Sequence, residues 1–408
     1  MQSRKLDVGN YLAIFLFISF SVALEASAQQ PAPSPDSKGK DAGVSVTSKS
    51  GVQAAGRPQT PDFKAPVVTG PDQNIHLNTS DGLDPKTKLP TYKTIVEDWS
   101  NLAIGKSELH PEPPLVAQTE DLGAFTRTLV QLKWRPGDPL DLYVILPKDV
   151  KNPPAVLYLY GHDEDTDRFK DDRWCARVTG GGVAAIGFVS ALTGHRFHDR
   201  PLKQWFVSEL QESLGSTVHD VKFILDYLAS RGDIDMNRIG MFGQGSGGTI
   251  AILAAAADSR IKAIDLLDPW GDWPVWLAKS SVVKEDPNKA NYVKPAFLKK
   301  VAPLDSVLWL PKLKSIHIRL TQPMDADPVP RICKDRIKLA LPHTKQVELV
   351  RYKTLAEMYN AQGAGYLFQW IKLLVKGLPT TASPAIGVKT AAATDTAQPD
   401  EKHSPSQN

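Results

Sequence analysis

Apolar residues in the middle of the chain follow two periods, one typical of buried strands and one typical of helices. Short continuous apolar runs bounded by turn residues predict strands that are buried on both faces. These runs lie at residues 155–160, 183–190, 239–243, 261–267, 315–321 and 347–352. Helical spacing predicts helices at residues 214–230, 246–257, 328–341 and 363–375, and another that passes through Trp174 and Cys175.

Regular alternation of strands and helices indicates parallel strands, right-handed crossovers and helices on both faces of one sheet. Residues 124–134 and 140–147 are two further strands, and the turn sequence at residues 135–139 joins them into an antiparallel hairpin at the sheet edge. The pattern therefore predicts an α/β fold with a mostly parallel, twisted sheet of about eight strands.

Composition divides the remainder of the chain. Residues 29–89 and 378–408 are rich in small and polar residues and in proline, and they have too few apolar residues to offset the entropy of ordering, so we expect disordered segments there. One domain at residues 90–377 is left between them. Residues 92–103 predict an amphipathic helix in this domain, and residues 271–312 are long enough for a small cap.

The N-terminus has the pattern of a secretory signal peptide. Arg4 and Lys5 precede the apolar run at residues 11–24, and Ala26-Ser27-Ala28 forms an A-x-A cleavage site before Gln29. A membrane-spanning anchor is the alternative, but it needs about 20 apolar residues and this run is shorter. The sequence predicts that residues 1–28 are removed and that the protein is exported, to the periplasm or the medium, with no membrane attachment after cleavage.

Charge and cysteine content exclude several classes of protein. The formal charge of the 408 residues is +3, and no basic run interleaved with aromatic residues is present, so we expect no nucleic-acid partner. Cys175 and Cys333 lie on helices predicted to cover opposite faces of the sheet, too far apart for a bridge. Two buried free thiols are therefore expected. No pattern for a cofactor or metal is present.

A glycine-rich segment joins the predicted strand at residues 239–243 to the helix that follows it. Such a segment makes a sharp strand-to-helix turn, and the residues two before and two after the turning residue must be small because strand and helix pass closely there. Gly243 and Gly247 meet this requirement around Gly245. They do not meet it around Ser246, whose neighbour two positions earlier is the bulky Gln244. The register therefore favours Gly245 as the turning residue.

With this turn, residues 124–375 resemble the α/β-hydrolase superfamily, in particular dienelactone hydrolases, acetylxylan esterases and the catalytic domain of prolyl oligopeptidases. The resemblance implies a nucleophilic serine at the turn, an acid after the seventh strand and a histidine after the last strand. Gly245 takes the serine position in the favoured register. The segment after the last strand, residues 353–362, contains no histidine; His343 precedes that strand and His403 lies in the tail.

The acid that the resemblance implies is present in the sequence. Asp327, or alternatively Asp325, follows the seventh predicted strand in an Asp-Pro turn. Asp327 is also suited to cap a helix that begins at Pro328.

The resemblance also implies an oxyanion pocket. Its donors would be the backbone N–H of Ser246 and one N–H from the loop at residues 161–163, and a helix N-terminus favours an anion. We therefore expect a small-molecule ligand, a carboxylate or an ester, at this turn. The candidate binding residues are Gly161, Gln244, Gly245, Ser246, Asp268 and Trp270.

Histidines and tryptophans near the same sheet edge leave alternatives open. His162, His195 and His198 could bind a metal with the acidic residues at 163–167, supply a relocated base for Ser246, or be solvated loop residues, although their spacing matches no zinc pattern. Tryptophans 270, 273 and 276 could form a sugar-stacking platform or the inner face of the cap.

Two functional hypotheses follow. The first is a weakly active or non-catalytic protein that binds a ligand at the glycine turn. The second is an active serine ester hydrolase or peptidase that uses Ser246 with Asp327 and a relocated base such as His162.

Overall fold

The computed structural model describes residues 79–83, 90–93, 112–134, 138–193, 196, 206–363 and 366–380. The predicted signal peptide and the tail beyond 380 lie outside these ranges. Two short strands, β1 (Thr79–Leu83) and β2 (Pro90–Lys93), form a separate antiparallel pair. Strand β1 falls inside the segment predicted to be disordered, and β2 covers the start of the helix predicted at residues 92–103, whose remainder is not described.

Nine strands of the described part form one sheet in the order β11-β10-β9-β8-β6-β7-β5-β4-β3. Five neighbouring pairs from β7 to β11 are parallel, whereas β3, β4 and β5 are antiparallel additions at one edge. The strands are β3 (Leu115–Asp121), β4 (Phe125–Leu132), β5 (Leu140–Pro147), β6 (Ala155–Leu159), β7 (Ala184–Gly187), β8 (Ile239–Gln244), β9 (Ile261–Leu267), β10 (His317–Pro323) and β11 (Val347–Tyr352). The predicted α/β fold is confirmed, with β3 as a strand that the sequence pattern missed.

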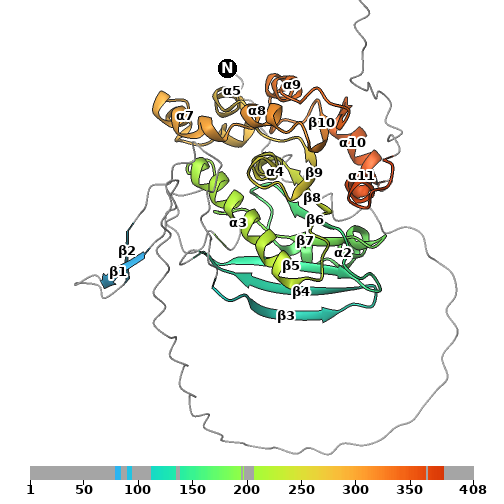
Figure 1. Cartoon of the computed structure of the whole chain (residues 1–408). Coiled ribbons are helices and arrows are strands. Elements are labelled where there is room, and N and C mark those ends of the chain that lie inside the picture. The colour runs from blue at the N-terminus through green and yellow to red at the C-terminus, as the bar shows by residue number, and fades with distance from the viewer. Residues whose placement is uncertain are drawn as a thin grey trace, which may run out of the picture. The chain divides into compact units, whose positions relative to one another are not determined.

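Helices cover both faces of this sheet, as Figure 1 shows. The main helices are α1 (Asp167–Lys170), α2 (Asp172–Thr179), α3 (Leu210–Arg231), α4 (Ser246–Ala257), α9 (Arg331–Leu339), α10 (Leu355–Gly363) and α11 (Tyr366–Val375). Between β9 and β10, where a cap was expected, lie α5 (Trp273–Lys279), α6 (Lys289–Tyr292), α7 (Pro295–Val301) and α8 (Ser306–Trp309) with three short 3-10 turns. No helix in the described ranges is both long and apolar enough to cross a bilayer.

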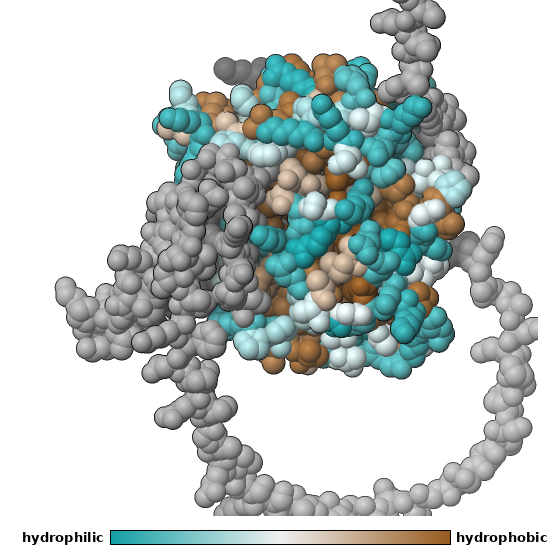
Figure 2. Space-filling model, viewed as in Figure 1, coloured by the Kyte–Doolittle hydropathy of each residue, from teal (hydrophilic) through white to brown (hydrophobic). Residues whose placement is uncertain are grey.

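Two hydrophobic cores fill the space between sheet and helices. One includes the inward faces of α3 and α4, and the other includes those of α2 and α11. Alternate residues of one strand point into different cores, as Leu157 and Tyr158 of β6 do, because side chains of a strand alternate between faces. Hydrophilic and hydrophobic residues are interspersed on the face shown in Figure 2.

The cysteines follow this division. Cys333 belongs to the first core and Cys175 to the second, and both are buried free thiols, as predicted. Burial raises the pKa of the Cys333 thiol to about 12, so it remains protonated at neutral pH.

Candidate functional site

The turn between β8 and α4 has the backbone of a tight elbow at Gly245. Its φ is 56° and its ψ is −120°, a conformation that residues with a side chain enter only with strain. The Gly245 N–H donates to the carbonyl of Leu267 on β9 over 2.9 Å, and the Gly245 carbonyl accepts from the N–H of Thr249 in α4 over 3.2 Å. These bonds hold the elbow between a sheet strand and the helix it starts.

Close backbone packing fixes the register of the elbow. A Cβ added to Gly243 would overlap the backbone of Gly247, and a Cβ added to Gly247 would overlap the carbonyl oxygens of Leu159 and Tyr160 on the neighbouring strand. Backbone cannot move aside as a flexible side chain does, so both positions require glycine. They lie two residues before and two after Gly245.

Ser246 lies one residue beyond the elbow and points inward. It is the first residue of α4 and is completely buried. Its Oγ finds no hydrogen-bond partner among the described residues. The neighbouring Gln244 ends β8 and is half-buried. In this conformation no solvent-borne substrate reaches the Ser246 hydroxyl.

Trp270 lies over the elbow. Its Nε1 would be 3.3 Å from a Cβ on Gly245, and its backbone N–H donates to the Gly245 carbonyl over 3.3 Å. The Trp270 carbonyl accepts from Thr249 Oγ1 at 2.8 Å and from Ser306 Oγ of the cap at 2.7 Å. The side chain is only 3% exposed. The elbow is therefore roofed by a fixed indole whose polar edge is directed at Gly245.

The loop after β6 adds a second wall. The His162 ring packs against Trp270 at a centroid distance of 5.2 Å and against Phe206 at 5.1 Å. Burial lowers the pKa of His162, although the nearby Asp163 carboxylate acts in the opposite direction. His162 is therefore a neutral imidazole in an aromatic cluster at neutral pH. Gly161 begins this loop, where a Cβ would lie 2.9 Å from an oxygen of Asp163.

A buried ion pair lies beside Trp270. Asp268 follows β9 with a φ of 46°, and its carboxylate is 3.3 Å from Nζ of Lys334 on α9. Lys334 is completely buried and also donates to the carbonyls of Pro323 and, at 2.9 Å, of Ala326. Burial raises the pKa of Asp268 to about 7 despite the ammonium beside it. Sequence reasoning missed this lysine, because nothing local marks a lysine on an amphipathic helix as buried.

The two candidate acids after β10 lie at the surface. Oδ1 of Asp325 accepts the Leu355 N–H at 2.6 Å and so fastens the start of α10. Asp327 is exposed and makes no hydrogen bond or ion pair with any described residue. It does not cap a helix at Pro328, because α9 begins at Arg331. The segment expected to be a loop after the last strand is largely the helix α10.

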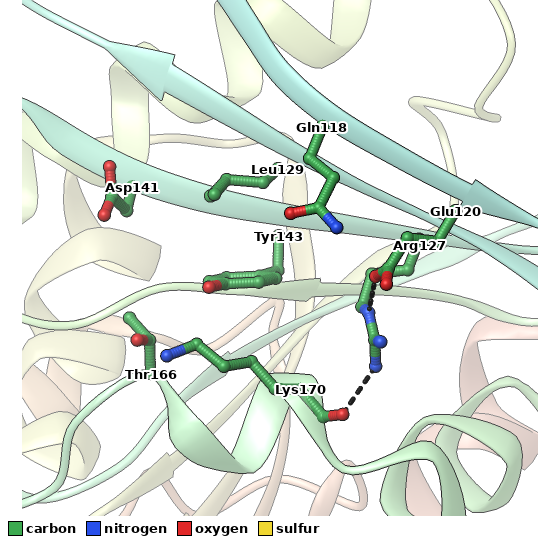
Figure 3. Close-up of a pocket in the computed structure, with 8 residues that line it drawn as sticks. All are labelled: Gln118, Glu120, Arg127, Leu129, Asp141, Tyr143, Thr166 and Lys170. Carbon is green, nitrogen blue, oxygen red and sulfur yellow. Dashed lines mark hydrogen bonds and ion pairs between the residues drawn. The ribbon is translucent and has the colours of Figure 1, made fainter. Parts of the chain in front are cut away.

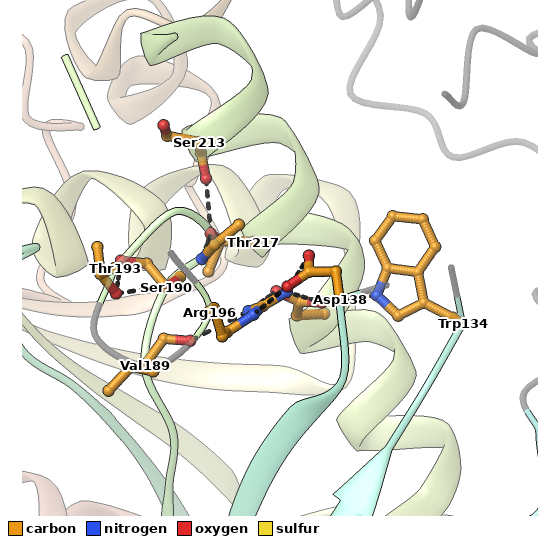
Figure 4. A network of polar contacts seen from close by, with 10 residues as sticks. Trp134, Asp138, Val189, Ser190, Thr193, Arg196, Ser213 and Thr217 are labelled. Atoms are coloured by element: carbon orange, nitrogen blue, oxygen red, sulfur yellow. Dashed lines mark hydrogen bonds and ion pairs between the residues drawn. The ribbon is translucent and has the colours of Figure 1, made fainter. Parts of the chain in front are cut away.

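The segment after β7 is held by a buried arginine. The guanidinium of Arg196 pairs with Asp138 at 2.8 Å and with Asp220 of α3 at 2.6 Å, and it also donates to the Val189 carbonyl at 3.2 Å (Figure 4). All three charged side chains are less than 5% exposed. Trp134 donates its indole N–H to the same Asp220 at 2.6 Å. His195 and His198 lie outside the described residues.

The other two tryptophans of the predicted cluster, Trp273 and Trp276, are interior. Trp273 and Trp276 are completely buried, and Trp276 stacks on Trp270 at 4.2 Å. They form the inner face of the cap and present no accessible platform. The described residues also contain no group of three or more histidine, cysteine or acidic side chains arranged to hold a metal.

Comparisons with known proteins agree with this geometry. No family model matches the chain. It is 32% identical over 141 residues to the Bacillus subtilis (strain 168) protein named Putative hydrolase YtaP, a match that spans 30% of the chain and 46% of that protein. The chain therefore spans about half the length of this relative.

Solved structures show the same architecture. The acetyl xylan esterase from Paenibacillus sp. R4 superposes with a TM-score of 0.52 at 17% identity, over 69% of this chain and 91% of that one. Acetyl xylan esterase 1 from Thermoanaerobacterium sp. JW/SL YS485 gives 0.48 at 12% identity, over 64% and 88%. The strand order, the elbow and the superposition on the Paenibacillus sp. R4 esterase show that the chain has the α/β-hydrolase fold.

Proposed function

We propose that the chain is an exported α/β-hydrolase-fold protein that has lost serine-hydrolase chemistry and binds a small carboxylate at the Gly245 elbow. The observation that carries the proposal is the elbow backbone of Gly245 between two positions that admit only glycine. The fold places its nucleophile at such an elbow, and here that position has no side chain.

The rest of the machinery supports the loss. A serine hydrolase needs a histidine that accepts the proton of its serine, and the two act as one unit. Residues 353–362 contain no histidine. Ser246 does not replace the missing nucleophile, because its Oγ is buried and contacts no base in the described part of the chain. No observation therefore favours the relocated-base hypothesis.

Donors without acceptors favour a carboxylate at the elbow. Two of the first N–H groups of the 12-residue helix α4, those of Gly248 and Thr249, donate to the Gly245 carbonyl. The N–H groups of Ser246 and Gly247 have no acceptor within the helix, and the helix dipole favours negative charge there. The Trp270 indole N–H is directed at the same elbow and is a further donor there. A carboxylate accepts hydrogen bonds and donates none, so it suits these N–H groups, whereas a protonated amine would add donors without an acceptor.

A fluorophosphonate probe and p-nitrophenyl acetate test the loss of chemistry. We expect no labelling of the wild type, and equal, near-background turnover in the wild type and in Ser246→Ala. Labelling at Ser246, located by peptide mass spectrometry, would establish the active-hydrolase alternative.

Ligand binding is tested separately by thermal melts with acetate, propionate and benzoate. Trp270→Phe keeps the ring and removes the N–H, so it should abolish the ligand-dependent rise in melting temperature. Trp309→Phe is the matched control, because the Trp309 indole already donates to the Pro303 carbonyl at 2.7 Å. No rise in the wild type, or an equal rise in Trp270→Phe, would refute carboxylate binding.

Export is tested by expression in a Gram-negative host. A mature N-terminus at Gln29 in the exported fraction is expected, and an uncleaved cytosolic chain would contradict export.

A further inference from the structure

We propose that a polar hollow between the antiparallel strands and α1 binds a neutral polyhydroxylated ligand, such as a terminal sugar unit. The hollow has a volume of about 390 Å³, which lies within the range of small-molecule sites. It is shown in Figure 3 and is lined by Gln118, Glu120, Arg127, Leu129, Asp141, Tyr143, Thr166 and Lys170.

The floor of the hollow is built from buried polar side chains. Tyr143 of β5 is 6% exposed, Arg127 of β4 is 7% exposed and Thr166 is 3% exposed. Polar groups at this depth are costly unless they are satisfied. In Figure 3 the Tyr143 ring lies between the strands and α1, with the Lys170 side chain reaching across the same space. The hollow is thus lined mainly by polar side chains, and the Tyr143 ring at its floor is almost completely buried.

The two cations around the hollow are already paired with acids. Arg127 is committed to Glu120 at 2.8 Å, to Asp172 at 2.9 Å and to the Lys170 carbonyl at 2.7 Å. The Lys170 ammonium is paired with Asp167 at 2.9 Å. With both cations already paired, the site offers no free positive charge to a phosphate or a carboxylate, and Asp141 has no cation paired with it among the described residues.

Hydrogen-bond donors and acceptors without a partner among the described residues remain at the rim of the hollow. The Gln118 amide makes no hydrogen bond with any described residue, and Asp141 accepts only one, at Oδ1 from Gln131 over 3.3 Å. Sugar hydroxyls donate and accept, so they match an amide beside a carboxylate oxygen. Leu129 is the only aliphatic residue in the lining, so a purely apolar ligand would leave most of the wall unsatisfied.

This hollow is separate from the elbow. Strands β7 and β6 lie between β5 and β8 in the sheet, so the strand of the elbow and the nearest strand of the hollow are about 14 Å apart, three strand spacings. The inference therefore does not depend on the function proposed for the elbow.

Saturation-transfer difference NMR on the full chain tests the proposal, with cellobiose, xylobiose and diacetylchitobiose as probes at millimolar concentration. We expect saturation transfer to at least one disaccharide, and titration should give a dissociation constant about tenfold weaker in Asp141→Ala and about fivefold weaker in Gln118→Ala. Both residues lie at the rim, so both variants should keep the wild-type melting temperature. Gln369→Ala, an exposed change on α11, is the matched control and should bind as the wild type does.

Three results would overturn the inference. They are no transfer to any of the disaccharides, equal affinity in the wild type and both rim variants, and binding of inorganic phosphate that depends on Gln118. The Trp270→Phe variant separates the two sites: sugar binding should survive in it even though carboxylate binding at the elbow is lost.

Discussion

Replacing elbow glycines one at a time tests the register on which the proposed function rests. Gly245→Ala places a Cβ 3.3 Å from Trp270 Nε1 and forces a residue with a side chain to adopt a φ of 56°. Gly247→Ala keeps an ordinary φ but places its Cβ against the carbonyls of Leu159 and Tyr160. The first change meets backbone strain and a movable side chain, whereas the second meets only immovable backbone.

The expected magnitudes differ accordingly. Strained backbone at Gly245 costs about 1 to 3 kcal/mol, and the lower entropy of the unfolded alanine chain returns about 0.4 to 1 kcal/mol. The net loss in the free energy of unfolding is therefore about 0 to 2.6 kcal/mol, centred near 1.3 kcal/mol, and that centre corresponds to roughly 3 to 5 °C in melting temperature. Gly247→Ala must separate β6 from α4, so we expect a loss above about 4 kcal/mol, in the exceptional class for one substitution.

Urea unfolding followed by tryptophan fluorescence and circular dichroism measures both losses. Gly123→Ala is the matched control, because Gly123 has a φ of 79° and a Cβ there meets nothing within 4 Å. The free energy of unfolding that Gly123→Ala loses measures the cost of a positive φ in the absence of any steric contact. If Gly247→Ala were as stable as Gly123→Ala, the close approach of strand and helix would be wrong, and with it the assignment of Gly245 to the elbow.

Further predictions concern the buried charges and the missing nucleophile. Arg196→Met leaves Asp138 and Asp220 buried without their cation, so it should destabilise the fold by about 3 to 5 kcal/mol in a urea titration. Arg168→Met removes a partly exposed ion pair with Glu164 and should lower the free energy of unfolding far less in the same titration. The pKa of Asp268 is raised in the folded state to about 7. Its contribution to stability is therefore complete below its ordinary pKa near 4 and is lost as the pH rises through 7. Asp268→Asn should remove this part of the pH dependence, and an unchanged slope of the unfolding midpoint against pH would contradict the raised pKa. Gly245→Ser alone should give no esterase turnover above Ser246→Ala, because no histidine stands ready to accept the serine proton; burst kinetics with p-nitrophenyl acetate would show the opposite.

The part of the fold that the sequence could predict follows mostly from the local periodicity of apolar residues. Strands buried on both faces, such as β6 and β9, are continuous apolar runs because no position of theirs meets water. The elbow register also followed from the sequence, since the requirement for glycine two residues either side of Gly245 is steric and local. Strand β3 was missed because it is an exposed edge strand, with Leu115 and Val116 more than half exposed, and so lacks a core-facing pattern.

Contacts between distant segments were decided only by the tertiary structure. Lys334 is buried because the fold brings α9 against the ends of β9 and β10, where Asp268 and two carbonyls surround its ammonium. Trp270 was a candidate binding residue, but its position over Gly245 depends on bonds to α4 and to Ser306 of the cap. The hollow beside Tyr143 combines residues of three strands and α1. Sequence period specifies which face of an element is buried, whereas the order of strands in the sheet determines which side chains meet there.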